Sequence, residues 1–345
     1  MKRLFFAITL VAICCSCSSS SKQDSQSDSS SKPEASERQG WLYGLLYGDV
    51  ESVVVTKYKL EQKNGEIVRG DIENCEKYYF NNAGDVIEKA QYNSDSSLRE
   101  KETYKYDALG NEIEWARYES DGSLDCMWVY KYDSSGNMIE WALYNSAGSL
   151  YNKSVWKYDS SGNQIESAWY NSYGSLRFKT IDKRDSLGNM IESAHYGSDG
   201  SLREKHIHKY DASGNMIEWV IYNSDGSLYE KNTRKYDSSG NMIERAVYTS
   251  DGSLDDKYIY KYDASGNMIE EDWYDSDGSL GERETWKYDA SGNMIEEASY
   301  RSDGSLRRKD IYKYDTSGNM IEESRYRGEA LLPDYQIVYE ITYRK

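Results

Sequence analysis

From residue 77 to residue 327, short apolar segments alternate with polar turns at a fixed spacing of 26 residues. Each unit contains two segments in which apolar and polar positions alternate, for example Met138 to Tyr144 and Leu150 to Tyr158. Alternation over such lengths is typical of half-buried strands, whereas helices this short would be marginal. The pattern therefore predicts ten two-stranded units that follow one another along the chain.

Two glycine-containing signals separate the strands of each unit. One is Asp-x-x-Gly-Asn, as in Asp133 to Asn137, and the other is Asn-Ser-x-Gly-Ser, as in Asn145 to Ser149. Asp or Asn in first place with Gly in fourth place favours a type I turn, in which Gly takes the left-handed position. We therefore expect two tight corners per unit.

Uninterrupted pairing outward from a corner predicts the register of the strands. The expected pairs are Tyr144 with Leu150, Ala142 with Asn152, Glu140 with Ser154, Ile139 with Val155, and Trp141 with Lys153. In this register the Glu column from Glu88 to Glu322 lies on the face opposite the Lys column that begins at Lys105. Both faces would then carry residues that repeat in every unit.

Near-identical units favour a fold that grows by addition rather than by separate cores. We expect an all-β fold, an elongated, twisted or coiled antiparallel β-meander, because a closed barrel would not need so many copies. The sequence does not say whether the sheet closes. Residues 41–76 are predicted to form N-terminal capping strands. Residues 328–345 are predicted to form a C-terminal capping strand, with Pro333 and charges suited to a sheet edge.

The first 40 residues follow a different pattern. A basic start precedes the apolar run Leu4 to Ile13, which is too short to span a bilayer and fits a signal peptide. Cysteines follow at once, so residues 1–17 resemble a bacterial lipoprotein signal with Cys17 lipidated and Cys15 as second choice. An ordinary cleaved signal peptide is the alternative.

The Ser-rich stretch 18–40 predicts a disordered tether. We therefore expect a lipid-anchored protein of the cell envelope, displayed on the outer-membrane surface, with the lipid as its only membrane contact.

A Tyr-Asp-x-x-Gly element recurs in the units and resembles the RHS/YD repeat family. Tyr-Asp stands at 106–107, 132–133, 158–159, 210–211, 236–237, 262–263, 288–289 and 314–315, with Arg184-Asp185 in the missing place. The resemblance covers residues 77–327 and implies long, spiralling β-sheets, with a loose association with cell surfaces and carbohydrate binding. The units are longer and more uniform than typical YD repeats, and the array is too short for the large shell that the family can build.

Charge and motifs narrow the classes of function. A net charge of −17 argues against a nucleic-acid partner, because phosphates would be repelled. The Glu column repeats in every unit, and catalysis needs one special site rather than a ladder, so we predict that the chain is not an enzyme. No phosphate loop or nucleophile motif is present, and we expect no cofactor.

Two places in the sequence resemble parts of a metal site. His206 and His208 share a strand face, and His195 lies on a neighbouring strand, but no acidic partner is set by spacing. The turn that contains Asp275 and Asp277 matches only part of a calcium loop, and turn formation explains it. We therefore predict no metal site.

Two sets of residues are candidates for ligand binding. Trp115, Trp141 and Trp219 share one column, and Trp169 and Trp273 share another. Such rings can stack on sugar faces, although cross-strand packing over Lys stems is favoured.

The second set interrupts the aromatic column that precedes Tyr-Asp. This column becomes Asp182, His208 and Arg234 in the middle of the array, and Arg184 replaces a Tyr nearby. Drift at a tolerant position is the alternative. We expect a binding scaffold for a glycan or a protein. A structural envelope spacer without a ligand is the alternative, and a carbohydrate-active enzyme is a remote one.

Overall fold

The computed structural model describes residue 41 and residues 46–330 and 332–345, and this part of the chain is all-β. Within it, no helix is long and apolar enough to cross a membrane. The predicted signal segment 1–17, the tether 18–40 and the lipidation candidates Cys17 and Cys15 lie outside the described residues.

The described residues form 22 strands, joined in chain order by short turns. They are β1 (Val50–Lys63), β2 (Glu66–Phe80), β3 (Val86–Tyr92), β4 (Leu98–Tyr106), β5 (Glu112–Glu119), β6 (Leu124–Tyr132), β7 (Met138–Asn145), β8 (Leu150–Tyr158), β9 (Gln164–Asn171), β10 (Leu176–Arg184), β11 (Met190–Gly197), β12 (Leu202–Tyr210), β13 (Met216–Asn223), β14 (Leu228–Tyr236), β15 (Met242–Tyr248), β16 (Leu254–Tyr262), β17 (Met268–Tyr274), β18 (Leu280–Tyr288), β19 (Met294–Arg301), β20 (Leu306–Tyr314), β21 (Met320–Arg327) and β22 (Tyr335–Tyr343). The predicted pair of strands per unit is therefore confirmed.

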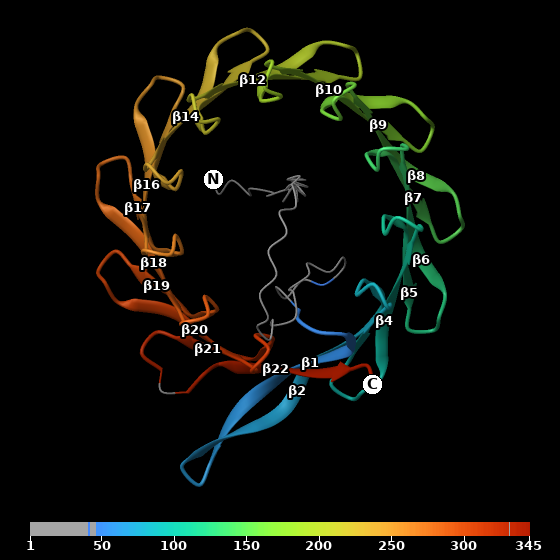
Figure 1. Ribbon diagram of the computed structural model, residues 1–345, viewed down its shortest axis with the longest axis vertical. Helices are drawn as coiled ribbons and strands as arrows, with labels where there is room; N and C mark the ends of the chain where they lie inside the picture. The colour runs from blue at the N-terminus through green and yellow to red at the C-terminus, as the bar shows by residue number, and fades with distance from the viewer. Residues whose placement is uncertain (1–40, 42–45, 331) are drawn as a thin grey trace, which may run out of the picture. The chain divides into compact units, whose positions relative to one another are not determined.

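These strands make one sheet that closes on itself. Each strand pairs antiparallel with the next, and β22 pairs both with β21 and with β1 (Figure 1). Val53 lies opposite Ile341 in the closing pair. The antiparallel meander of repeated strand pairs is confirmed, and its closure answers the question that the sequence left open. The expected edge after Pro333 is wrong. Residues 50–63 and 335–343 are extended and rich in β-branched and aromatic side chains, so each supplies the hydrogen-bonding partner that the other lacks.

The corners form as predicted. The Asp133 carboxylate accepts hydrogen bonds from the backbone N–H groups of Ser135 and Asn137, both at 2.9 Å, and from the Asn137 side chain at 3.0 Å. Gly136 has a φ of 83°, a conformation that side chains with a Cβ rarely adopt. The Asp of Tyr-Asp therefore stabilises the turn that follows it.

A β-bulge next to each corner changes the register. Tyr144 pairs with Leu150 as predicted, but Leu143 then pairs with Asn152, which leaves Tyr151 as an extra residue. The pairs that follow are Ala142 with Lys153, Trp141 with Ser154, and Glu140 with Val155. All predicted pairs beyond the first are therefore wrong by one residue, because a bulge sets two residues of one strand against one of its partner.

The corrected register places the Glu and Lys columns on one face, since Lys131 lies directly opposite Glu140. The other face carries Tyr78, which is fully buried in a cluster with Leu46 and Val53. Residues 46–49, which lead into β1, lie inside the ring (Figure 1), and Leu46 belongs to the cluster around Tyr78, so the face of Tyr78 is the inner one. We refer to the inner face and the outer face in this sense below.

Candidate ligand-binding face

The outer face is nearly the same in every unit. Three of its columns do not vary along the array: Glu at 88, 114, 140, 166, 192, 218, 244, 270, 296 and 322; Lys at 105, 131, 157, 183, 209, 235, 261, 287 and 313; and Tyr at 92, 118, 144, 170, 196, 222, 248, 274, 300 and 326. A small residue, most often Ala, lies between the Glu and Tyr columns and is buried, as at Ala142. The strand side chains that recur in every unit therefore lie mainly on the outer face.

The inner face changes from unit to unit. The column that contains Tyr78 continues as Tyr104, Tyr130, Trp156, Asp182, His208, Arg234, Tyr260, Trp286 and Tyr312. The column opposite it reads Lys89, Trp115, Trp141, Ser167, Ser193, Trp219, Arg245, Glu271, Glu297 and Glu323. The tryptophan candidates and Asp182, His208 and Arg234 all lie on this face.

The constant outer residues form a ladder of ion pairs. Glu140 accepts from Lys131 on one side at 2.7 Å and meets Lys153 on the other at 3.4 Å. The Lys–Glu pair repeats at each described unit from Lys105 to Glu322. The outer Glu residues therefore bind lysines rather than hydroxyls. Hydrogen bonds from Lys209 and Lys231 lower the pKa of Glu218 below its usual range.

The tyrosines of Tyr-Asp fasten neighbouring units together. The hydroxyl of Tyr236 donates to the backbone carbonyl of Met216 at 2.8 Å, and equivalent bonds recur along the array. Where Arg184 replaces this tyrosine, its Nε donates to the equivalent carbonyl, that of Gln164, at 3.1 Å. Its Nη1 also donates to the carbonyl of Gly188 at 2.8 Å. Two of the three guanidinium nitrogens of Arg184 are thus bonded within the protein, so it serves the fold in the place of a tyrosine.

Tryptophan rings gather on the inner face between β5 and β10. Trp115 lies 4.1 Å from Trp128, and Trp141 meets Trp169 edge to face at 4.9 Å, measured between ring centroids. Trp169 also stacks on Phe178, which is 48% exposed. The rings are half-buried against one another rather than over Lys stems. We call this row, from Trp115 to Phe178, the aromatic arc.

Trp273 lies apart from the aromatic arc, in a shallow cleft lined by Tyr258, Glu271, Glu282 and Glu284. Its indole N–H donates to Asp256 at 2.9 Å. Burial, and then the charge of Glu284, raise the pKa of Glu271 above its usual range. The cleft thus combines an aromatic face with carboxyl groups, a combination suited to hydroxyl-rich ligands.

The middle of the inner face is polar. Asp182 is buried and accepts from Ser193 at 2.7 Å and from Gln164 at 3.1 Å. His208 lies nearly parallel to the ring of Trp219, with 6.3 Å between centroids. Burial lowers the pKa of His208. Arg234 reaches the sulfur of Met216. These three candidates therefore occupy one polar region but make separate contacts.

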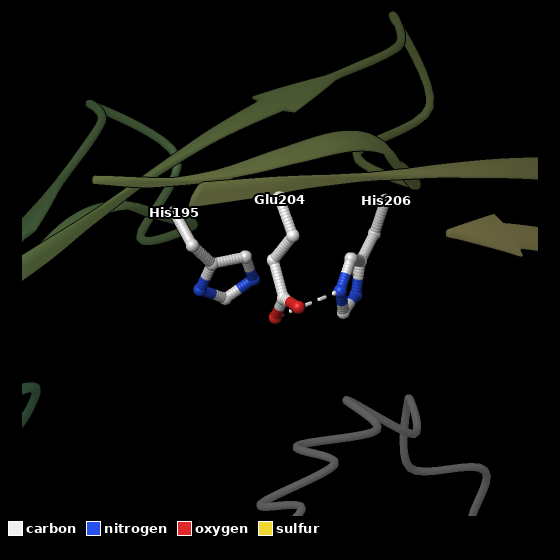
Figure 2. Close-up of side chains that lie close together, drawn as sticks. All are labelled: His195, Glu204 and His206. Atoms are coloured by element: carbon white, nitrogen blue, oxygen red, sulfur yellow. Dashed lines mark hydrogen bonds and ion pairs between the residues drawn. The ribbon is translucent and has the colours of Figure 1, made fainter. Parts of the chain in front are cut away.

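In this region the structure adds an acidic partner, Glu204, to two of the histidines that the sequence offered for a metal. His195 on β11 lies opposite Glu204 on β12, and His206 follows on the same strand (Figure 2). One ligand atom of each residue lies within 4.8 Å of the others. Uninterrupted register would have set His195 opposite Arg203, so the acidic partner becomes visible only once the bulge is known. Burial, followed by the charge of His206, lowers the pKa of His195.

No protein-family model matches this sequence. No curated protein matches it either. Among solved structures, a TcdB2-TccC3 crystal structure is 12% identical over 87% of this chain and 22% of that chain, with a TM-score of 0.29. The Photorhabdus luminescens Tc holotoxin pore is 12% identical over 76% of this chain, with a TM-score of 0.25. A porin-like protein from Bacteroides uniformis is 9% identical over 85% of this chain and 96% of that one, with a TM-score of 0.30. The chain spans about a fifth of the length of the first structures it matches, 19% in each case.

Proposed function

We propose that this chain is a binding scaffold of the cell envelope that holds a glycan on its inner face. The observation that carries this proposal is the separation of constant outer residues from varied inner ones. A face that only supports the sheet needs the same contacts in each unit, as the outer Glu–Lys ladder illustrates. Variation on the opposite face is typical of a surface that binds a ligand whose own structure does not repeat.

The chemistry of the inner face favours a glycan over other ligands. The aromatic arc offers ring faces to sugar C–H groups, and Phe178 at its end is exposed. The Trp273 cleft adds carboxyl groups that accept hydrogen bonds from hydroxyls. A protein ligand is the second candidate. The net charge of −17 disfavours nucleic acid.

The proposal places the protein on a membrane through its N-terminal lipid alone. The outer face presents Lys side chains that are highly exposed, 61% for Lys131, and ion-paired to Glu140. Charged side chains on a lipid-facing surface are costly, so the outer face suits water. Cys17 remains the proposed lipidation residue, with Cys15 as second choice, and the outer-membrane surface the proposed location.

A glycan array probed with the purified protein tests this function. We expect binding to a defined subset of glycans, and we expect Trp273→Ala or Trp169→Ala to weaken it about tenfold or more, as loss of a stacking contact would. Tyr173→Ala is the matched control, because Tyr173 is 91% exposed at a turn and lies off the inner face. Equal loss in the control, or binding untouched by both tryptophan variants, would overturn the proposal.

The alternatives give different results in the same experiments. A structural envelope spacer would bind no glycan and no protein, although protease treatment of intact cells would still cleave it if it were displayed. A carbohydrate-active enzyme would release shortened products from a bound glycan. Neither alternative accounts for the varied inner face as directly as binding does.

A further inference from the structure

All three histidines of the 345-residue chain lie close together on the inner face. His195 comes from β11, and His206 and His208 come from β12. The ring centroids of His195 and His206 are 4.8 Å apart. His208 lies nearly parallel to the ring of Trp219, and His206 also packs against that ring, with 5.6 Å between centroids. This packing does not involve Glu204, which lies opposite His195.

The arrangement has the spacing of a metal site. The Nε2 atom of His206 lies 3.3 Å from a carboxylate oxygen of Glu204. Two ligands bound tetrahedrally to zinc at about 2.0–2.1 Å are about 3.3–3.4 Å apart. Glu204 lies between the two imidazole rings, and all three side chains project from the same side of the sheet (Figure 2). A small movement of the His195 ring would complete a three-ligand set.

The residues around His195 fit such a role. One ring nitrogen, Nδ1, is hydrogen-bonded to the hydroxyl of Thr180 at 3.0 Å. Metal-binding histidines usually use one nitrogen for an outer partner of this kind, which fixes the ring while the other nitrogen binds the metal. Ser193 lies 3.5 Å from the second nitrogen and is itself bonded to buried Asp182. The contact with Thr180 therefore leaves Nε2 as the nitrogen of His195 that a metal ion would use.

The next unit provides a comparison without the histidines. Glu230 occupies the place of Glu204, but Asn232 and Ile221 stand where His206 and His195 stand. There the Asn232 amide donates to Glu230 at 2.6 Å, and no metal ligand set forms. Among the residues that the structure describes, the same backbone thus carries the cluster at β11 and β12 alone.

We propose that His195, Glu204 and His206 bind one divalent transition-metal ion, with zinc as the first candidate. Imidazole nitrogen and carboxylate oxygen are ligands that zinc accepts, and the three protein ligands leave one position for water or a further ligand. This site is independent of glycan binding and replaces the expectation that the chain holds no metal.

Equilibrium dialysis of the full-length protein against zinc tests the site. We expect one zinc ion per chain. His195→Ala and His206→Ala should each lower the affinity by at least about tenfold, and Glu204→Gln should lower it as well. Glu230→Gln is the matched control and should bind zinc like the unaltered protein. Cobalt in place of zinc should give a visible absorption band that disappears in His206→Ala.

Circular dichroism confirms that each variant keeps its strands. Should His195→Ala fail to fold, His195→Trp replaces it, because Trp169 occupies the same place in the preceding unit. The inference is overturned if zinc binds with less than one ion per chain at saturation. It is equally overturned if a His195→Trp, His206→Asn double variant binds zinc as tightly as the unaltered protein.

Discussion

The outer and inner faces of the same strands follow different rules. On the outer face each unit repeats the Glu–Lys pair, the buried small residue and the tyrosine. On the inner face neighbouring units differ as much as Trp141 and Ser167 do, or Trp219 and Arg245, in one column. Because the two faces share one backbone, the outer contacts can hold the register while the inner positions change. The difference teaches that the repeated outer contacts serve assembly of the sheet and leave the inner positions free to vary.

The largest expected loss of stability comes from Asp310, an inner-face residue that stabilises the fold and is therefore an exception to the contrast between the two faces. Asp310 is fully buried and is bonded to Arg325 at 2.7 Å and 3.1 Å, with Arg308 as a further partner. Arg325→Ala should lower the free energy of unfolding by about 2–4 kcal/mol, because it leaves a buried charge poorly paired. Urea denaturation measures this. The Asp310→Ala, Arg325→Ala double variant should recover part of the loss, and no recovery would contradict the pairing.

A second variant, Glu112→Met, replaces a residue that departs from the repeat with the one found in other units. Burial raises the pKa of Glu112 to about 7, whereas the equivalent residue is Met at 138, 190 and 216. The folded protein therefore holds this proton more tightly than the unfolded chain does. Its contribution to stability is full at acid pH and falls as pH rises from the ordinary value of 4.5 through about 7. Glu112→Met should raise stability at pH above this range by about 1–2 kcal/mol, allowing for solvent screening.

Thermal unfolding at a series of pH values measures this effect. The variant should lose less stability than the unaltered protein between acid and mildly alkaline pH. Equal pH dependence of the two proteins would show that Glu112 is not the group responsible.

A smaller effect concerns the link between units. Tyr236→Phe removes the hydroxyl that donates to the Met216 carbonyl at 2.8 Å while keeping the ring. We expect a loss of about 1 kcal/mol, the usual net value of such a bond. Tyr229→Phe is the control, because Tyr229 is 58% exposed. A control that loses as much as Tyr236→Phe would argue against a linking role for the hydroxyl.

The smallest expected effect tests one rung of the outer ladder. Hydrogen bonds from lysines lower the pKa of Glu218 below 4.5, so its contribution is present above that value and is lost as pH falls through the lowered one. Glu218→Gln should cost about 0.5–1 kcal/mol at neutral pH, as expected of exposed pairs, and nothing in acid. High salt should shrink the difference, and a loss that persists in acid would point to a cause other than charge.

The sequence predicted which candidate residues occupy equivalent positions in successive units, but not which side chains they contact. Trp115, Trp141, Trp169, Trp219 and Trp273 were grouped correctly by column. Their packing against other rings depended on the true register. Arg184 stood out as an exception to the motif, but its structural role required the carbonyl of Gln164, 20 residues earlier. Glu204 was missed because a one-residue bulge decides which residues lie opposite each other.

The amino-acid sequence by itself determined the strands, the glycine corners and the carboxylate turns, because these depend on neighbours within a few residues. Tertiary structure alone decided three further properties: closure through β1 and β22, the sharing of one face by Glu and Lys, and the inner position of the varied residues. Each of these depends on pairing between strands. A bulge that adds one residue to a strand reverses every side chain beyond it, and the repeat pattern looks the same with or without that reversal.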